Sequence, residues 1–243
     1  MYRASNTFSV PQAVTTTVFV VLGLSLLNLL VFRFAEATNL EVVTAPDTSA
    51  DVGDGVQTDA ELTFFVTGVT AGTVVGENVT KDDTAATVVP FGSLAVDEAA
   101  TAAQQLAVET SSPQGFAVTV QTNRQLTSET KEAVIDGYIG GTYIDVPTAW
   151  TSPVPVPGSE KTYGHWGISS DDTTDMPMNF ANASHFVSAS TSPTTVFNGN
   201  GSTVETAGDK NTATVIYKAE VSALQEVSND YTAQVTYVAT PKI

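Results

Sequence analysis

An uncharged stretch runs from residue 4 to residue 32 of this chain, and from Val18 onward it is dense in Val, Leu and Phe. The sequence that follows is acidic and rich in Thr, Val and Ala. An apolar segment of this length predicts delivery of the chain to a membrane. We therefore divide the chain into a hydrophobic N-terminal helix, residues 1–37, and a body, residues 38–243.

The N-terminal segment has two interpretations. Arg3, the apolar run and the sequence Ala35-Glu36-Ala37 fit a secretory signal that is cleaved after small residues. Residues 13–34 are also long enough for a retained helix that crosses the hydrocarbon core, and Pro11 suits the start of such a helix. The presence of residues 1–37 in the chain favours retention.

On a retained helix, Ser25 and Asn28 lie on one face, where small or polar side chains favour helix–helix contact in an apolar setting. In a cleaved signal the same two residues merely interrupt the apolar run. The positions expected to form an assembly helix are Val18, Leu22, Ser25, Asn28, Leu29 and Phe32.

Composition limits the partners of the body. The formal net charge is −17, which repels phosphate backbones, so we expect no nucleic-acid partner. The chain has no cysteine, so neither a disulfide nor a thiolate is available. Stability must then come from packing or from assembly with other copies.

The body reads as short strands separated by turn residues. Residues 62–69, 104–110, 115–122, 212–222 and 231–239 are apolar runs or alternate apolar with polar residues, which predicts strands. We expect an all-β fold, an antiparallel β-sandwich preceded by the one N-terminal helix.

Turn chemistry suggests how some of these strands connect. The sequence Ser-Ser-Pro-Gln-Gly at residues 111–115 predicts a hairpin-like turn. The runs 212–222 and 231–239 are expected to form a terminal antiparallel pair, with Lys218 and Glu220 facing outward. The proline-rich segment 148–158 predicts a crossover between sheets, or else a linker that divides the body near residue 150.

Chemical motifs are few. His165 and His185 do not form a zinc pattern, and no Gly-x-Ser-x-Gly motif supports a hydrolase, so we expect no enzyme. Carboxylates in two turn-rich loops are candidate calcium ligands, because calcium takes six to eight oxygen ligands. The candidates are Asp47, Asp51 and Asp54 in the first loop, and Asp171, Asp172 and Asp175 in the second.

Three stretches of the body resemble a recurring pattern of exported bacterial surface proteins. The pattern consists of three segments in the order "FG-L", "tATq-L-V-Tn" and "-GY-VT", followed by a closing strand. The three segments are resembled here by residues 90–94, 102–111 and 115–120, and the closing strand by residues 229–241. Such sequences occur in secreted β-sandwich proteins of the candidate-phyla-radiation bacteria and are loosely similar to WxL-type surface domains. The Trp-x-Leu signature itself is missing here, so the resemblance does not imply attachment to peptidoglycan.

The N-terminal helix resembles that of type IV pilins, although the glutamate near the start of the pilin helix is missing. Together the two resemblances imply an extracellular, cell-surface location and a pilus-like filament built from copies of the chain, with the membrane as a partner during export or anchoring. An alternative is a monomeric adhesin, secreted or tethered by one helix. Trp150, Tyr163 and Trp166 are its candidate contact residues.

Overall fold

The computed structural model describes residues 60–138, 146–173, 176–203 and 211–242. Within these ranges the chain forms strands and one short 3₁₀ helix, which confirms the all-β prediction for the body. A helix long and apolar enough to cross a membrane is not found among the described residues. The predicted helix within residues 1–37 lies outside them.

Most strands belong to one large sheet. Its order is β1-β4-β12-β9-β10-β8, and β7 lies beside β9 and also pairs with β6. All neighbours are antiparallel except β7 and β9. The bounds are β1 Leu62–Gly68, β4 Ala100–Thr110, β6 Leu126–Ser128, β7 Ala133–Gly137, β8 Thr148–Ala149, β9 Gly164–Ser170, β10 His185–Ser188 and β12 Asn211–Val221.

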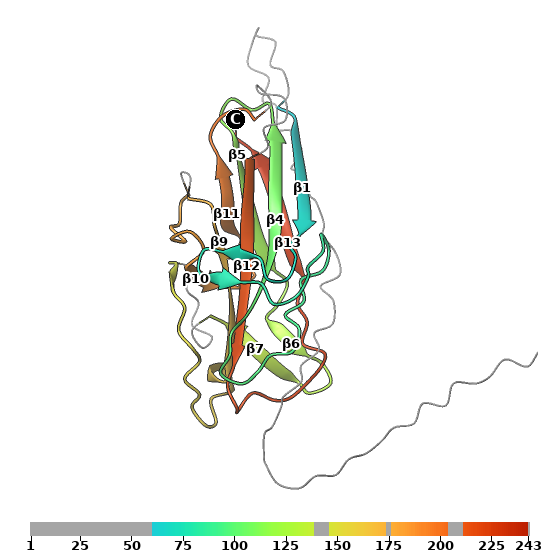
Figure 1. The fold of residues 1–243 in the computed structure, drawn as a ribbon, viewed down its shortest axis with the longest axis vertical. Helices are drawn as coiled ribbons and strands as arrows, with labels where there is room; N and C mark the ends of the chain where they lie inside the picture. Colours follow the sequence, from blue (N-terminus) through green and yellow to red (C-terminus); the bar gives the residue numbers. More distant parts are fainter. Residues whose placement is uncertain (1–59, 139–145, 174–175, 204–210, 243) are drawn as a thin grey trace, which may run out of the picture.

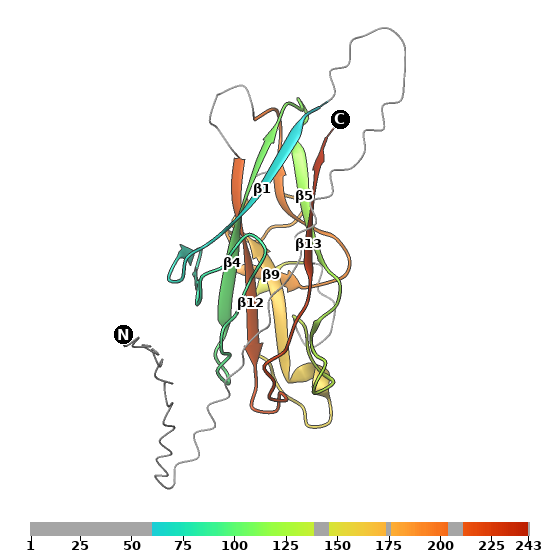
Figure 2. The same cartoon turned by 90° about the vertical axis from the view of Figure 1, so that its right-hand side faces the viewer.

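A small antiparallel sheet covers one face of the large sheet (Figures 1 and 2). It has the order β11-β5-β13, with β5 Phe116–Thr122, β11 Thr194–Gly199 and β13 Val235–Pro241. A separate two-stranded sheet pairs β2, Val74–Val75, with β3, Asn78–Val79, and the 3₁₀ helix η1 spans Glu160–Thr162.

The core between the sheets follows the alternation of apolar residues. Leu106 and Val108 of β4 are fully buried, as are Phe116 and Val118 of β5. The residues between them are more exposed, as expected for strands with one face on a core. Burial of this set supplies the main driving force for packing the two sheets.

Part of the outer face of the large sheet is covered too. A second cluster, here called the outer cluster, contains Val75, Ala103, Tyr138, Ala183, Phe186 and Ile216. Ala103 and Ile216 are register partners on β4 and β12, and point away from the main core. Around Ala103 and Ile216, the central strands β4 and β12 are therefore buried on both faces.

Two predicted strand pairings are wrong. The turn at residues 111–115 is present, with Gly115 at φ 86° and its N–H donating to Ser112 O at 3.1 Å. It does not close a hairpin, because β4 pairs with β1 and β12 while β5 pairs with β11 and β13. Likewise β12 and β13 lie in opposite sheets. Alternation of apolar residues identifies the buried face of a strand but not its neighbour.

The segment near residue 150 connects strands of one sheet. β4, which precedes it, pairs along most of its length with β12, which follows it. Thr148 and Ala149 form β8 on β10. The described strands on the two sides of residue 150 thus share their hydrogen-bond ladders.

A tyrosine pair joins the two sheets through the core. The hydroxyls of Tyr217 on β12 and Tyr237 on β13 are hydrogen-bonded to each other, and Tyr237 also donates to Gln104 Oε1 at 3.2 Å. Burial of both rings raises the pKa of each phenol above its ordinary value. Both phenols are therefore protonated at neutral pH.

We expect Tyr237→Phe to destabilise the fold more than Tyr217→Phe does. Loss of the Tyr237 hydroxyl leaves both Tyr217 and Gln104 without this partner, a cost of about 1–3 kcal/mol, whereas loss of the Tyr217 hydroxyl costs about 1 kcal/mol. Urea unfolding measures both. Tyr163→Phe, which removes a hydroxyl near the surface, is the control. Equal losses of stability in Tyr237→Phe and Tyr217→Phe would contradict the arrangement in which Tyr237 bonds to both Tyr217 and Gln104.

Candidate functional site

The structure describes only some of the predicted site residues. The six assembly-helix positions, the first aspartate loop and Asp175 lie outside the described residues. Asp171 Oδ1 accepts from the Thr214 N–H at 2.7 Å, and Asp172 Oδ2 accepts from the Asn198 N–H at 2.8 Å. These two carboxylates hold β12 and β11. In the part of the chain that the structure describes, no three His, Cys, Asp or Glu residues are grouped as metal ligands, and calcium stays a prediction.

The aromatic residues considered for adhesion are differently placed. Trp166 is 2% exposed in the main core, and its indole N–H donates to Gln125 Oε1 at 2.6 Å. Tyr163 is half-buried and its hydroxyl accepts from the Gly158 N–H at 2.8 Å. Trp150 is half-buried and covers the outer face of the large sheet. Trp166 is thus a core residue, as its size and apolar neighbours favour.

Trp150 is the centre of an aromatic group on that outer face. Its ring stacks on Tyr138 with centroids 4.6 Å apart and planes 4° apart. It meets His165 edge-on at 4.8 Å and Phe186 at 5.2 Å. Tyr138 also meets His165 edge-on, at 5.1 Å. These offsets and edge contacts are the favoured geometries for aromatic rings.

Two charged side chains of β12 lie under this aromatic group. The Trp150 indole N–H donates to Glu220 Oε2 at 2.7 Å, and Lys218 Nζ lies 5.4 Å from the Trp150 ring centroid. Lys218 also donates to Asn78 Oδ1 at 3.0 Å, while burial lowers the pKa of its ammonium. The prediction that Glu220 faces solvent is wrong, because it is 2% exposed beneath the outer covering.

His165 is enclosed by the same group. The residue is 3% exposed, and its buried Nε2 has no hydrogen-bond partner among the described residues. Burial lowers the pKa of His165 to about 4 from its ordinary value of 6.5, against the smaller opposing effects of Glu220 and a hydrogen bond with the backbone of Thr151.

We expect His165 to make the fold sensitive to acid. A neutral histidine is favoured in the folded state, so its stabilisation is complete above pH 6.5 and declines as the pH falls from 6.5 towards 4. The loss amounts to about 3 kcal/mol. Urea unfolding of the wild type and of His165→Phe at several pH values in this window measures the loss, because the variant has no titratable group at position 165.

His185→Phe is the matched control, since His185 is partly exposed outside the aromatic group. It is expected to retain the wild-type pH dependence. The same slope of stability against pH in wild type and His165→Phe would show that His165 is not the acid-sensitive group.

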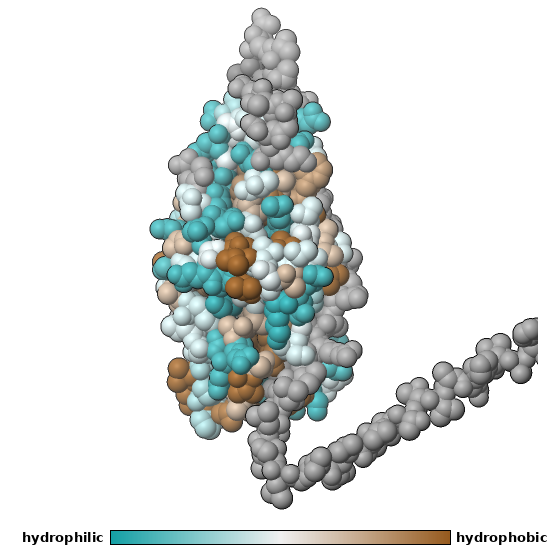
Figure 3. Space-filling view, in the orientation of Figure 1, coloured by the Kyte–Doolittle hydropathy of each residue, from teal (hydrophilic) through white to brown (hydrophobic). Residues whose placement is uncertain are grey.

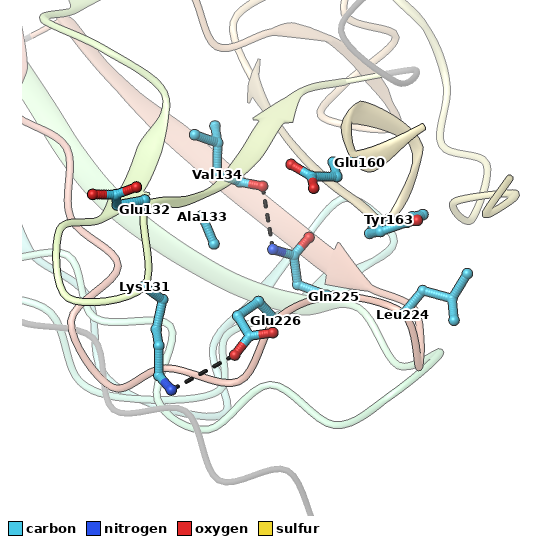
Figure 4. Close-up of a pocket in the computed structure, with 9 residues that line it drawn as sticks. All are labelled: Lys131, Glu132, Ala133, Val134, Glu160, Tyr163, Leu224, Gln225 and Glu226. Carbon is cyan, nitrogen blue, oxygen red and sulfur yellow. Dashed lines mark hydrogen bonds and ion pairs between the residues drawn. The ribbon is translucent and has the colours of Figure 1, made fainter. Parts of the chain in front are cut away.

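A pocket of about 170 Å³ lies at the end of the sandwich formed by β6, β7, η1 and the β12–β13 connection (Figure 4). We call it the end pocket. Its lining residues are Lys131, Glu132, Ala133, Val134, Glu160, Tyr163, Leu224, Gln225 and Glu226. They come from three segments far apart in the chain, so no local motif could have indicated this pocket.

The polar groups of the end pocket are mostly exposed carboxylates. Lys131 Nζ lies 3.6 Å from Glu226 Oε1, with about half of each side chain exposed. Such a pair contributes little to stability in water. Glu132 and Glu160 are exposed as well, so the lining carries three carboxylates against one ammonium. The arrangement can attract a cation.

A scan against protein-family models found no matching family, and a search of curated proteins found no match either.

Proposed function

We propose that this protein is a structural subunit of an extracellular, pilus-like filament or cell-surface assembly. The observation that carries the proposal is the outer edge of β1. Among the described residues, β1 pairs only with β4 and is an end strand of the large sheet. Its sequence, Leu-Thr-Phe-Phe-Val-Thr-Gly, contains no charge and no proline.

The other end strands carry features that limit pairing with another chain. β8 has two residues, β11 contains a register shift between Thr195 and Phe197, and β13 ends in Pro241. Short strands, bulges and proline are the usual protections of a sheet edge. β1 has none of them, and its length of seven residues suits addition of a strand from another copy.

The path of the chain supports this mode of assembly. Glu61, just before β1, exchanges hydrogen bonds with Ser111, and the Lys242 N–H donates to Gly115 O at 2.8 Å. The start and the end of the described body are therefore held by the same β4–β5 turn, at the end opposite the end pocket (Figure 1). Residues 39–44 precede β1 in the chain and are our candidate donor strand.

A retained N-terminal helix offers a second means of assembly, in which helices bundle in the filament axis and the sandwiches lie outside. Export across the membrane precedes either mode. The monomeric adhesin remains the competing proposal, but one of its three aromatic contact residues, Trp166, is committed to the core.

Charges placed on β1 are expected to stop assembly. Thr63 and Thr67 are exposed on one face of β1, so Thr63→Lys with Thr67→Lys leaves the core intact. Lysine side chains along an edge strand oppose the addition of a further strand, because their ammonium groups would lose water, so these changes should lower the mass of sedimentable fibres about tenfold or more. Electron microscopy and sedimentation of the purified full-length protein measure this.

The matched control is Thr236→Lys with Thr240→Lys, which adds the same charge to the outer side of β13. It should assemble as the wild type does. Fibres that form equally well from the β1 variant would exclude the β1 edge as the contact. A wild-type protein that remains monomeric at all concentrations would favour the adhesin.

The mature N-terminus decides between the two modes of assembly. We expect intact-mass spectrometry of protein from its native host to find the apolar segment retained, with Ser25→Leu plus Asn28→Leu impairing fibre formation, because polar side chains specify helix contacts in an apolar setting. A mature protein that begins at Thr38 would rule out the helical core and leave strand addition.

A further inference from the structure

The end pocket contains an acceptor that nothing in the described structure satisfies. Gln225 is 5% exposed, and its Oε1 is buried without a hydrogen-bond partner in the described part of the chain. Buried polar atoms are nearly always paired, and an unpaired one is costly to keep. This oxygen therefore marks a position where a donor is missing.

The orientation of the Gln225 amide is fixed by its other end. Nε2 donates to Tyr231 Oη at 2.8 Å and to Val134 O at 3.2 Å, and the Tyr231 hydroxyl in turn donates to Glu226 O. A flipped amide would place an oxygen against the Val134 carbonyl, so the nitrogen belongs there. Figure 4 shows Oε1 turned to the side of the pocket on which Glu160 lies.

Space for the oxygen depends on a glycine. A Cβ added to Gly164, the first residue of β9, would lie 2.9 Å from Gln225 Oε1 and 3.0 Å from Val221 Cγ1. Any side chain at this position would press on the amide. The oxygen thus lies between the Gly164 backbone and the side of the pocket that carries the exposed Glu160 side chain (Figure 4).

The charges around the pocket favour a cation, and its shape favours an organic one. Three glutamates and one lysine line it, yet no three acidic or histidine side chains in the described ranges lie close enough to hold a metal. Leu224 and Tyr163 add apolar surface to the same lining. An ammonium on an alkyl arm meets both requirements, with the arm along Leu224 and Tyr163.

The surroundings of the pocket are those of a contact surface. Leu224 and Val227, on the β12–β13 connection, are 44% and 45% exposed. Figure 3 shows apolar groups gathered at this lower end of the molecule. Exposed apolar residues around a polar pocket are typical of protein interaction sites.

We propose that the end pocket binds a lysine side chain presented by another polypeptide. The ammonium lies on the Glu160 side of the pocket and donates a hydrogen bond to Gln225 Oε1 once the Glu160 side chain turns aside, while Glu132 and Glu226 add negative charge to the rim. This inference is independent of the proposed filament, because it requires only a partner that displays a lysine.

n-Butylamine, which reproduces the lysine arm and ammonium, is the probe. Titration of the full-length protein at pH 7, followed by two-dimensional amide NMR, should give saturable shifts at residues 131–134, 160–164 and 224–226. We expect half-saturation on the order of millimolar for so small a ligand. n-Butanol, which has the arm without the charge, should give no saturable shifts at these residues.

Variants separate the pocket from general attraction to an acidic protein. Glu160→Gln should weaken butylamine binding about threefold or more, whereas Glu61→Gln, the same change at the opposite end of the body, should leave it unchanged. Glu132→Gln provides a second test within the pocket. Saturable butylamine binding supports the proposal only if Glu160→Gln weakens it and Glu61→Gln does not.

Three outcomes would overturn the proposal. The first is the absence of saturable shifts up to about 100 mM butylamine. The second is equal weakening by Glu160→Gln and Glu61→Gln, which indicates diffuse charge attraction. The third is evidence for another kind of ligand. Butanol that binds as strongly as butylamine would assign the pocket to an apolar group, and calcium chloride that displaces butylamine at a lower concentration would assign it to a metal.

Discussion

The pairing of β4 with β12 is the interaction on which the rest of the structure depends. The two strands are in register from Val108 and Asn211 to Ala100 and Ala219, and they connect β1 on one side to β9 on the other. Their inner face carries the main core, and their outer face carries the outer cluster. Where the outer cluster covers the sheet, a polar side chain has no solvated side on which to lie, and it either finds a partner within the fold or, like His165, is held neutral.

That requirement explains the chemistry of the outer face. Glu220 accepts the Trp150 indole N–H, Lys218 reaches Asn78, and His165 is held neutral among aromatic rings. These groups are at positions that would be ordinary surface residues in a sheet with one solvated face. Their partners come from distant segments, and the group as a whole holds the outer covering on the sheet. Burial beneath the outer covering therefore accounts for the lowered pKa values of His165 and Lys218.

The two ends of the sandwich have different characters. At one end the β4–β5 turn holds the start and the end of the described body, next to the uncharged strand β1. At the other end the β12–β13 connection, η1 and the β6–β7 pair enclose the end pocket, with its carboxylates and a Gln225 oxygen that has no partner in the described part of the chain. The two ends of the sandwich therefore present chemically different surfaces.

The sequence alone predicted the runs that become β1, β4, β5, β12 and β13, but not the strands between β5 and β12. In β5 the alternation of Phe116, Val118 and Val120 also predicted the buried face, because successive side chains of a strand point to opposite sides. The sequence also determined the acidic character of the body and its lack of disulfides. Only the tertiary structure decided which strands are neighbours, that Tyr217 and Tyr237 meet across the core, that Glu220 is buried, and that residues near 131, 160 and 225 form one pocket. Local patterns specify a face because side chains alternate along a strand, whereas partners depend on the free energy of contacts far apart in the chain, which no local pattern contains.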